Sequence, residues 1–305
     1  MNYNKWYENN TKSLKGKLVA VTGATGGIGK ELCFHLARLE ADLVLLNRSR
    51  EKTETLINEL KKEFGSINVS FVPLDLESIE SVDNAVLELE SNCPDIFIHN
   101  AGAYSIPRHK TSLGIDNVFQ INCISPYYLT SRLFQALKEN NSRVIVVGSI
   151  AHNYSKTDVN DIDFSKRSAA SKVYGNAKRR LMLSEYERFK NEREVTLSVC
   201  HPGITLTNIT AHYPKIIFAL IKHPMKLIFM SPKKASLCIL KGIFEECAFG
   251  EWIGPRFFGI WGLPKRTALK TFENSESQRV FAETEELLNN RLKNQVGKQS
   301  AATPK

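Results

Sequence analysis

The sequence predicts an α/β protein with one doubly wound parallel sheet that is covered by helices on both faces. From Gly16 to Cys200, short apolar runs alternate with stretches of amphipathic helical spacing. This alternation produces βαβ units whose strands are parallel and buried on both faces, and right-handed crossovers wind them into a doubly wound sheet. No repeat or linker-like change of composition occurs before about residue 265, so a single domain is expected.

Seven apolar runs are predicted as strands, because each is short and most are rich in β-branched residues. The last of them, at 251–255, includes the turn that follows it. In chain order the runs are 17–22, 42–46, 69–74, 95–99, 143–148, 195–200 and 251–255.

The stretches between the first six runs have the spacing of amphipathic helices. In the first stretch, Ile28, Leu32, Leu36 and Leu39 fall along one face. The predicted helices cover 27–39, 50–64, 78–89, 112–137 and 171–189, and a helix of unassigned role is predicted over 272–292.

These elements divide the chain into three parts. A polar segment at 1–13 precedes the main domain, which covers 14–264. Residues 265–305 hold the last predicted helix and a polar tail, which we expect to be disordered from Asn294 onward.

Two groups of side chains late in the main domain have alternative interpretations. The apolar run from Phe257 to Trp261 either lines a pocket or closes the core, and the core is favoured. Arg179 and Arg180 follow Lys178 directly and are expected to form a solvated helix face.

The composition is that of a soluble globular protein with a basic excess. The formal net charge is +9, and 24% of the residues are charged. A basic balance favours phosphate-bearing ligands, anionic membrane surfaces or nucleic acid, although solvated Lys and Arg residues give the same figure. No basic stripe interleaved with aromatic residues is visible, so nucleic acid is not an expected partner.

The six cysteines are scattered singly along the chain. None lies in a C-x-x-C pair or at metal-ligand spacing with histidines, so no metal site is expected. Such cysteines are typical of reduced thiols in an intracellular protein. The first 13 residues lack an apolar signal region, and no run reaches the ~18 apolar residues of a membrane-spanning helix. A cytoplasmic location is therefore expected.

A glycine-rich turn follows the first predicted strand and precedes a helix. Gly23, Gly27 and Gly29 have the spacing T-G-x-x-x-G-x-G. Such a turn lets the backbone approach a pyrophosphate, to which the helix N-terminus offers N–H donors and a positive dipole end. The alternative is a tight turn without a ligand.

The second strand is followed by a cation instead of an acid. An acidic side chain here would hydrogen-bond the adenosine ribose of NAD, whereas an arginine accommodates the 2′-phosphate of NADP. Arg48 stands at this point, so NADP(H) is favoured over NAD(H). The alternative is that Arg48 is only a solvated residue at the start of a helix.

Further polar patterns follow the remaining strands. Asp75-Leu76 follows the third and His99 to Gly102 (HNAG) the fourth. Ser149 ends the fifth strand, 174–178 (YGNAK) lies in the next helix, and 201–207 (HPGITLT) follows the sixth strand. All lie where open α/β sheets bind ligands, and this order is improbable by chance.

With these motifs the chain resembles the short-chain dehydrogenase/reductase family, and within it the branch of the retinol dehydrogenases, over residues 14–264. The resemblance implies a Rossmann-type fold and hydride transfer between a nicotinamide cofactor and a carbonyl or alcohol. His99 departs from the family's N-N-A-G pattern, which affects a minor structural contact. The long segment between Ser149 and Tyr174 looks like the insertion of the retinol-dehydrogenase branch.

The resemblance also implies roles for single residues. Asn122, Ser149, Tyr174 and Lys178 match the family's catalytic set, in which Asn122 is implied to hold a water that links Lys178 to solvent. Together with the glycine turn and Arg48, the residues expected to contact the cofactor are Gly23, Thr25, Gly27, Ile28, Gly29, Arg48, Asp75, Leu76, Asn100, Ala101, Gly102, Tyr174, Lys178, Pro202, Gly203, Ile204 and Thr207.

The chemistry of carbonyl reduction suits three of these residues. Tyr174 can donate the proton, but the ordinary pKa of a phenol, about 10, is too high for efficient work at neutral pH. Lys178 lies four residues on, on the same helix face, and a nearby cation is expected to lower that pKa. Ser149 can hydrogen-bond the substrate oxygen. Each residue alone also has a structural interpretation, and the assignment depends on their order along the chain.

The segment after the sixth strand is expected to select the substrate. A substrate lid is expected over about 205–232, and its part 213–230 is markedly apolar with interspersed lysines. Three interpretations remain open: a lid over a pocket for a small lipophilic substrate, peripheral contact with an anionic membrane surface, or a packed helix pair or homo-oligomer interface.

The sequence thus predicts an NADP(H)-dependent oxidoreductase that interconverts a lipophilic ketone or aldehyde and its alcohol. A non-catalytic dinucleotide sensor or scaffold is the alternative from another class. A sugar-nucleotide epimerase or dehydratase is a third option, which the lack of a separate C-terminal substrate domain weakens.

Overall fold

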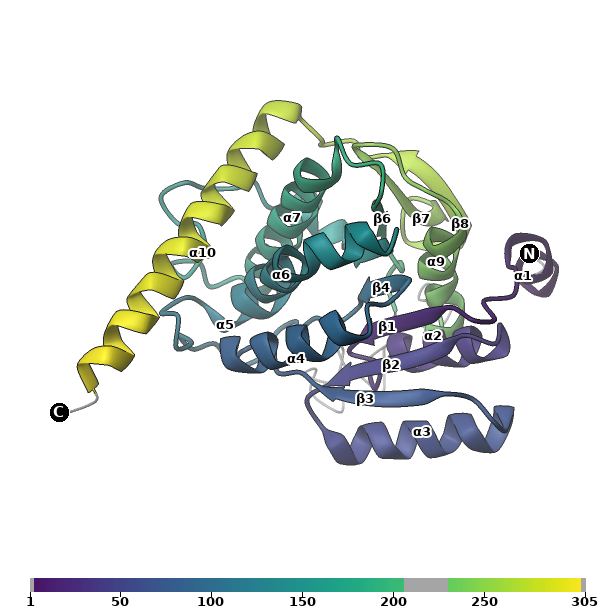
Figure 1. The fold of residues 1–305 in the computed structure, drawn as a ribbon. Helices are drawn as coiled ribbons and strands as arrows, with labels where there is room; N and C mark the ends of the chain where they lie inside the picture. Colours follow the sequence, from purple (N-terminus) through teal and green to yellow (C-terminus); the bar gives the residue numbers. More distant parts are fainter. Residues whose placement is uncertain (1–2, 206–229, 303–305) are drawn as a thin grey trace, which may run out of the picture.

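The structure is a computed structural model that describes the backbone of residues 3–205 and 230–302 and the side chains of these ranges as far as residue 295. The predicted lid segment therefore lies almost entirely outside the described residues. Within these ranges, eight strands form one sheet in the order β3-β2-β1-β4-β5-β6-β7-β8 (Figure 1). The strands are β1 Leu18–Thr22, β2 Asp42–Asn47, β3 Val69–Pro73, β4 Ile96–His99, β5 Arg143–Val147, β6 Thr196–Cys200, β7 Glu251–Phe257 and β8 Trp261–Ala268.

The sheet is doubly wound, as the sequence predicted. Every neighbouring pair from β3 to β7 is parallel, and only β8 runs antiparallel, beside β7. The strand order reverses between β1 and β4, so the crossovers leave in opposite directions from this point. Ligands of open α/β sheets bind in the crevice at such a switch point.

Helices cover both faces of the sheet. The side chains of α2, α3 and α9 pack on one face with α1 outside them, and those of α4, α6 and α7 pack on the other face with α10 outside (Figure 1). The helices are α1 Tyr3–Asn10, α2 Gly27–Arg38, α3 Arg50–Phe64, α4 Ile79–Ser91, α5 Asn117–Phe119, α6 Ser125–Glu139, α7 Ala170–Phe189, α9 Pro232–Phe244 and α10 Asn274–Ala302, with the π-helical turn η1 Gln120–Ile124 and the 3-10 helix η2 Ile150–Tyr154.

Local chemistry explains where several helices begin. The Ser49 hydroxyl accepts a hydrogen bond from the Lys52 N–H at the start of α3, and Ser78 and Ser231 cap α4 and α9 in the same way. The helical stretch predicted from Ser112 begins only at Asn117, because the Asp116 carboxylate accepts the N–H of Phe119 and so caps α5.

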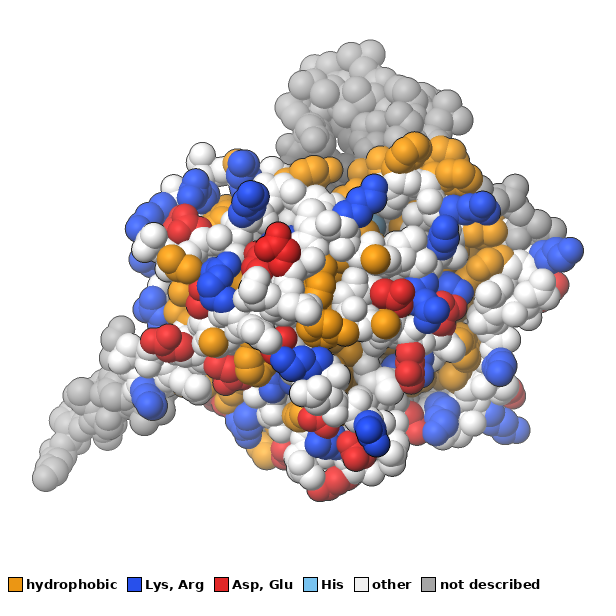
Figure 2. All heavy atoms as spheres, turned by 90° about the horizontal axis from the view of Figure 1, so that it is seen from above, with side chains coloured by type: hydrophobic (Ala, Val, Ile, Leu, Met, Phe, Trp, Pro, Cys, Tyr) orange, Lys and Arg blue, Asp and Glu red, His pale blue; other side chains and the backbone are white. Residues whose placement is uncertain are grey.

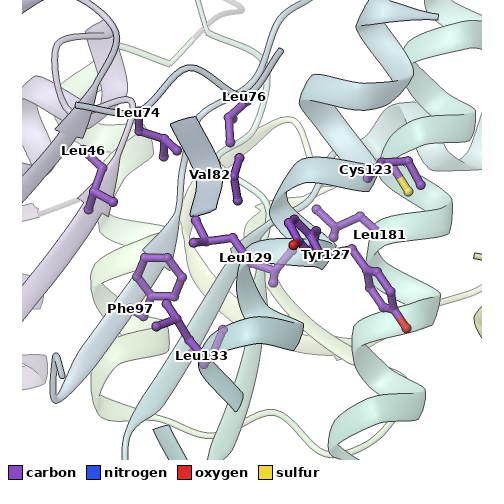
Figure 3. Packing of buried hydrophobic residues seen from close by; sticks show 14 of the residues in the cluster. Leu46, Leu74, Leu76, Val82, Phe97, Cys123, Tyr127, Leu129, Leu133 and Leu181 are labelled. Carbon is purple, nitrogen blue, oxygen red and sulfur yellow. The ribbon is translucent and has the colours of Figure 1, made fainter. Parts of the chain in front are cut away.

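The core between the sheet and the α4–α6–α7 layer is apolar. Figure 3 shows part of it, where Phe97 of β4 lies among Leu129 and Leu133 of α6. Each of these side chains is fully buried, and burying a side chain of this size stabilises the fold by about 1.5–3 kcal/mol. The strand carboxyl ends above this core are therefore held in fixed positions.

The end of the chain differs from the sequence prediction in three ways. The hairpin turn after β7 leaves Phe258 84% and Trp261 44% exposed, so the prediction that this run closes the core is wrong for these two residues. The physical cause of this exposure is the edge strand β8, which was not predicted. β7 and β8 form a hairpin, and this hairpin carries residues 257–261 beyond the end of the core. α10 runs to Ala302, so the tail that was expected to be disordered from Asn294 is helical to that residue.

Arg179 and Arg180 are also not the solvated face that the sequence predicted. Arg180 has no exposed surface, and both guanidinium groups form ion pairs with carboxylates of α10. The reason is that α10 covers this face of α7.

No helix in the described ranges is long and apolar enough to cross a membrane. Figure 2 shows basic and acidic side chains interspersed on one face, with apolar side chains gathered toward one edge of it.

Candidate active site

A cleft of about 630 Å³ lies at the carboxyl ends of the central strands. It is lined by nearly all of the predicted site residues that the structure describes. Asn122 lies behind this lining, and Thr207 is outside the described residues. The residues that line the cleft, of those predicted, are Gly23, Thr25, Gly27, Ile28, Gly29, Arg48, Asp75, Leu76, Asn100, Ala101, Gly102, Ser149, Tyr174, Lys178, Pro202, Gly203 and Ile204.

The glycine turn between β1 and α2 forms one end of the cleft. Gly23 adopts φ +65°, and a Cβ atom on Gly29 would lie 2.3 Å from the Gly23 carbonyl oxygen. Only glycine therefore allows α2 to begin this close to the strand. Because the first residues of α2 line the cleft, its free N–H groups and positive dipole end are available to a phosphate.

Thr22 and Asn100 join this turn to the end of β4. The Thr22 hydroxyl oxygen accepts hydrogen bonds from the backbone N–H groups of Asn100 and Ala101, each at 3.0 Å. The Asn100 side-chain nitrogen donates to the carbonyl oxygens of Thr22 and Gly23, each at 3.0 Å. Thr22 was not predicted as a site residue, and its place at the end of β1 is the signal that could have identified it.

His99 stands where the family pattern has its first asparagine. Its Nε2 atom lies 2.7 Å from the Thr130 hydroxyl oxygen on α6. Burial, together with the charge of Lys178, lowers the pKa of His99 to about 3. The imidazole is therefore neutral at physiological pH and serves as a buried link between β4 and α6.

Ser149 and Tyr174 meet at the centre of the cleft. The Ser149 hydroxyl accepts the Ala151 N–H at the start of η2, 3.2 Å away, and lies close enough to the Tyr174 phenol to lower its pKa. Gly175 makes this approach possible, because a Cβ atom there would lie 2.3 Å from the Ala151 carbonyl oxygen. The missing side chain lets α7 pack directly against η2.

Lys178 lies one turn further along α7, with 2% of its surface exposed. Its ammonium donates a hydrogen bond to the Val147 carbonyl oxygen at 2.9 Å and lies 5.9 Å from the centre of the Tyr174 ring. Burial lowers the pKa of Lys178 to about 8. The group is therefore mostly protonated at neutral pH but gives up its proton far more readily than a solvated lysine.

The pKa of Tyr174 departs from the sequence expectation. Burial raises it to about 12, more than the polar contact with Ser149 lowers it, and the nearby Tyr104 raises it further. The Tyr104 ring packs edge-on against Tyr174, with 5.3 Å between ring centres. The net shift of this pKa is therefore opposite to the sequence expectation, because the loss of solvation outweighs the effects that lower it.

Asn122 lies in the π-helical turn η1, behind Gly102. Its side-chain nitrogen donates to the carbonyl oxygens of Ala103 and Val118, each at 2.8 Å, and its oxygen accepts the Ala103 N–H at 3.1 Å. Both amide donors are therefore used by the backbone, and only Oδ1 retains acceptor capacity. The amide braces the loop that carries Ala103 and Tyr104.

His152 and His201 pack against Trp252 and contact backbone carbonyl groups near the site. They flank Trp252, with ring centres 5.1 and 5.0 Å from it. His152 Nδ1 lies 2.7 Å from the Ser149 carbonyl oxygen, and His201 Nε2 lies 2.9 Å from the Gly259 carbonyl oxygen. Burial lowers the pKa of both, in His201 to about 3. These neutral rings are structural supports.

The segment after β6 closes the cleft on the other side. Gly203 adopts φ +82°, and the Ile204 N–H donates to the Ile260 carbonyl oxygen at 3.3 Å. Thr205 forms a parallel bridge with Met230 on the far side of the undescribed segment. The predicted contact of Thr207 with the cofactor therefore stays a prediction.

Two cations and a buried amide stand at the end of β2. Arg48 and Lys52 are exposed, line the cleft and form no ion pair within the described ranges. Asn47 is buried, and its side-chain nitrogen has no hydrogen-bond partner among the described residues. Lys52 was not predicted; it lies in the first turn of α3 and lines the cleft together with Arg48.

The strand order, the switch point and the glycine turn define an NAD(P)-binding Rossmann-type fold. The chain belongs to the short-chain dehydrogenase family, whose model matches residues 17–215. This finding confirms the resemblance noted in the sequence.

Curated relatives share about a third of their residues with the chain. Dehydrogenase/reductase SDR family member 13 of Bos taurus is 33% identical over 251 residues, covering 80% of this chain and 65% of the relative. Retinol dehydrogenase 13 of Homo sapiens is 32% identical, covering 66% and 62%, and human polyprenol dehydrogenase is 28% identical, covering 64% and 63%. The chain thus spans less than two thirds of the length of these relatives.

Solved structures share the fold at lower identity. An uncharacterized protein from Mycobacterium paratuberculosis superposes with a TM-score of 0.73 at 20% identity, covering 92% of this chain and 96% of that chain. L-sorbose reductase from Gluconobacter frateurii, in complex with NADPH and L-sorbose, has a TM-score of 0.59 at 19% identity and covers 76% and 91%. At these identities the likeness concerns the fold.

Proposed function

We propose that the protein is an NADP(H)-dependent oxidoreductase that interconverts a lipophilic ketone or aldehyde and the corresponding alcohol. One observation carries the proposal: Ser149, Tyr174 and Lys178 meet in the cleft whose other end is the glycine turn. Relatives named retinol dehydrogenase and polyprenol dehydrogenase support an alcohol or carbonyl substrate of apolar character.

Tyr174 is the proton donor for reduction and the acceptor for oxidation. Its raised pKa of about 12 keeps the phenol protonated at neutral pH, which is the form that reduction requires. Ser149, which lies beside the phenol, places a second donor where the substrate oxygen gains charge. A bound nicotinamide supplies the hydride to the carbonyl carbon or takes it from the alcohol carbon.

Lys178 restores the proton that Tyr174 gives up. Its lowered pKa of about 8 makes the ammonium a ready proton source, and its charge favours the phenolate left after transfer. Asn122 contributes by holding the loop beside Gly102 and by the free acceptor capacity of Oδ1, which can accept a water on the path to Lys178.

The end of β2 fits the 2′-phosphate of NADP(H). Arg48 and Lys52 line the cleft and form no ion pair among the described residues, and no carboxylate replaces them at the end of this strand to bind ribose hydroxyls. The Asn47 side-chain nitrogen, which has no partner in the described ranges, is a further donor for a ribose or phosphate oxygen.

The described wall of the cleft near Tyr174 is largely apolar. Tyr104, Ile121, Ile150, Tyr154 and Ile204 line it, which supports a lipophilic substrate. The segment 213–230 lies outside the described residues, so its roles as a lid, a membrane contact or an oligomer interface remain alternatives.

The test is a fluorescence titration with NADPH and NADH, followed by NADPH oxidation against apolar ketones, aldehydes and quinones. We expect NADPH to bind at least about tenfold more tightly than NADH, because a charge-assisted contact is lost with the phosphate. Turnover of an apolar carbonyl supports the proposal. Tight binding without turnover of any carbonyl favours the sensor or scaffold, and failure to bind either cofactor contradicts both functions.

A further inference from the structure

The C-terminal helix α10 and the residues just before it contact the end of the η2 helix and the loop that follows it. We name residues 153–158, which are the last two residues of η2 and the four residues after it, the rim loop, because Tyr154 lines the cleft with 59% of its surface exposed. α10 begins at Asn274, well beyond the part of the chain that the family model matches. A contact between the two joins a segment outside that match to the substrate side of the cleft.

Thr157 is the rim-loop residue that meets α10. Its hydroxyl donates a hydrogen bond to Glu276 Oε1 and accepts one from a guanidinium nitrogen of Arg279, both at 2.8 Å. Just before the helix, the Thr271 hydroxyl donates to Asn153 Oδ1 at 3.2 Å. Both ends of the rim loop are therefore bonded to the C-terminal part of the chain.

The same carboxylates of α10 hold α7, the helix that carries Tyr174 and Lys178. The Arg179 Nε–H donates to Glu276 at 2.9 Å, and the fully buried Arg180 pairs with Glu283 at 2.7 Å. Arg180 also donates to the Asp158 carbonyl oxygen at 3.2 Å. Rim loop, α7 and α10 thus share one network of buried or half-buried charges.

These contacts restrict the conformations that the rim loop can adopt. Apart from them, two contacts anchor the loop: the Ser155 hydroxyl donates to the Lys172 carbonyl oxygen of α7, and Asp158 pairs with Arg167 at 2.9 Å. A surface loop with few anchors samples many conformations. Three bonds to α10 and to residues just before it remove that freedom, and they fix Tyr154 relative to Ser149, which begins the same short segment.

We propose that α10 is a positioning element of the substrate site, which acts through Thr157 to hold the rim loop and Tyr154 in place. The inference rests on the proposed function for its substrate. It implies that a long apolar substrate, which reaches the rim, depends on Thr157, whereas a short one that contacts only Ser149 and Tyr174 does not.

Two isosteric substitutions test this inference. Thr157→Val removes both hydroxyl bonds to α10 and leaves the pairs of Arg179 and Arg180 intact. Thr284→Val is the matched control, because the Thr284 hydroxyl accepts from Ser184 of α7 at 3.2 Å but meets no rim-loop residue. Each variant removes one hydroxyl group that makes two hydrogen bonds involving α10, and only Thr157→Val changes the rim loop.

The kinetic measurement uses NADPH with butanal and dodecanal as short and long carbonyl probes. For Thr157→Val we expect KM for dodecanal to rise about fivefold, with kcat, KM for butanal and the Kd of NADPH changed less than about twofold. Thr284→Val should leave all four values near those of the wild type. An equal rise of KM for both aldehydes, or the same pattern in both variants, would overturn the inference.

Amide hydrogen exchange separates this inference from the proposed function. We expect peptides covering the rim loop to exchange about tenfold faster in Thr157→Val, and at the wild-type rate in Thr284→Val. Unchanged exchange in Thr157→Val overturns the inference whatever the kinetics. A wild-type protein that binds NADPH but turns over neither aldehyde counts against the proposed function, and the exchange rates then decide the role of α10.

Discussion

At the scale of single residues, burial shifts the pKa values of Tyr174 and Lys178 in opposite directions. It raises the pKa of the Tyr174 phenol to about 12 and lowers the pKa of the Lys178 ammonium to about 8. Under the proposed function, the proton stays on Tyr174 until a substrate oxygen accepts it, and Lys178 is the nearby group that replaces it.

Removing the phenol hydroxyl tests this assignment. We expect Tyr174→Phe to lower kcat by about a thousandfold, because the proton donor is lost, while the Kd of NADPH stays within about twofold. Steady-state kinetics and fluorescence titration measure the two effects. Tyr104→Phe is the control, since it keeps the ring that packs on Tyr174. Near-normal turnover by Tyr174→Phe would remove the residue from the mechanism.

The charge of Arg48 tests the cofactor preference. We expect Arg48→Asp to weaken NADPH binding by about a hundredfold and to leave NADH binding equal or stronger, because the carboxylate repels the 2′-phosphate and can accept ribose hydroxyls. Lys52→Asp should act in the same direction with a smaller effect. Unchanged NADPH affinity in Arg48→Asp would show that the phosphate is bound elsewhere.

Sequence patterns could place these residues but not their electrostatic state. The order of motifs located Ser149, Tyr174 and Lys178 in one cleft, because strand carboxyl ends meet at one edge of the sheet. The sign of the shift at Tyr174 depends on how much solvent the fold removes, which spacing along a helix does not contain. Thr22 was missed although it ends β1 directly before the glycine turn, and Lys52 was missed because a single lysine in the first turn of a helix such as α3 has no distinctive pattern.

At the scale of elements, the contact of α7 with η2 sets the distance between Tyr174 and Ser149. Gly175 is the point of closest approach, and a Cβ atom there would also lie 2.8 Å from the Ser155 hydroxyl oxygen. Any change that moves α7 away from η2 therefore also separates Ser149 from Tyr174, the two groups that we propose to contact the substrate oxygen.

A methyl group at this contact is therefore expected to reduce catalysis. Gly175→Ala should lower kcat about a hundredfold, because displacements near 1 Å have effects of this size, with NADPH affinity within about threefold. Gly242→Ala on α9 is the matched control, since its Cβ would meet Cys200 Sγ at 2.4 Å in the opposite layer. If both variants lose stability and activity in parallel, the spacing of α7 and η2 is not the cause.

Helices and strands were predicted correctly where the sequence has a strong apolar pattern, and they were missed where tertiary contacts determine the local structure. The buried parallel strands were found because they are continuous apolar runs. β8 was missed because an edge strand such as 261–268, with Pro264, Lys265 and Arg266, lacks both alternation and an apolar run. The extension of α10 to Ala302 was missed because the polar residues at its C-terminal end form no apolar face.

At the scale of the whole molecule, α10 seals a face of α7 that carries buried charge. Glu185 has no exposed surface, and neither of its oxygens has a hydrogen-bond partner of normal geometry in the described ranges. Arg188 Nε lies 3.6 Å away, and Arg188 also pairs with Glu285 of α10 at 3.2 Å. No sequence pattern could show this, because the layer that buries Glu185 comes from about a hundred residues further along the chain.

The buried carboxyl makes the stability of the whole fold depend on pH. Burial raises the pKa of Glu185 from 4.5 to about 7, against the lowering effects of Arg188 and Thr130. The folded protein therefore binds this proton more tightly than the unfolded chain. Its contribution to stability is fully present below pH 4.5 and is lost as the pH rises through about 7.

Replacing Glu185 by a neutral isostere should remove that loss. We expect Glu185→Gln to raise the free energy of unfolding by about 2 kcal/mol at about pH 8 and to change it little at about pH 5, because only the charged carboxylate lacks compensation. Urea unfolding at the two pH values measures the difference. Glu285→Gln, which removes the more exposed partner of Arg188, should give no gain at the higher pH. A Glu185→Gln protein that is less stable than the wild type at both pH values would mean that the ion pair with Arg188 outweighs the cost of burying the charge.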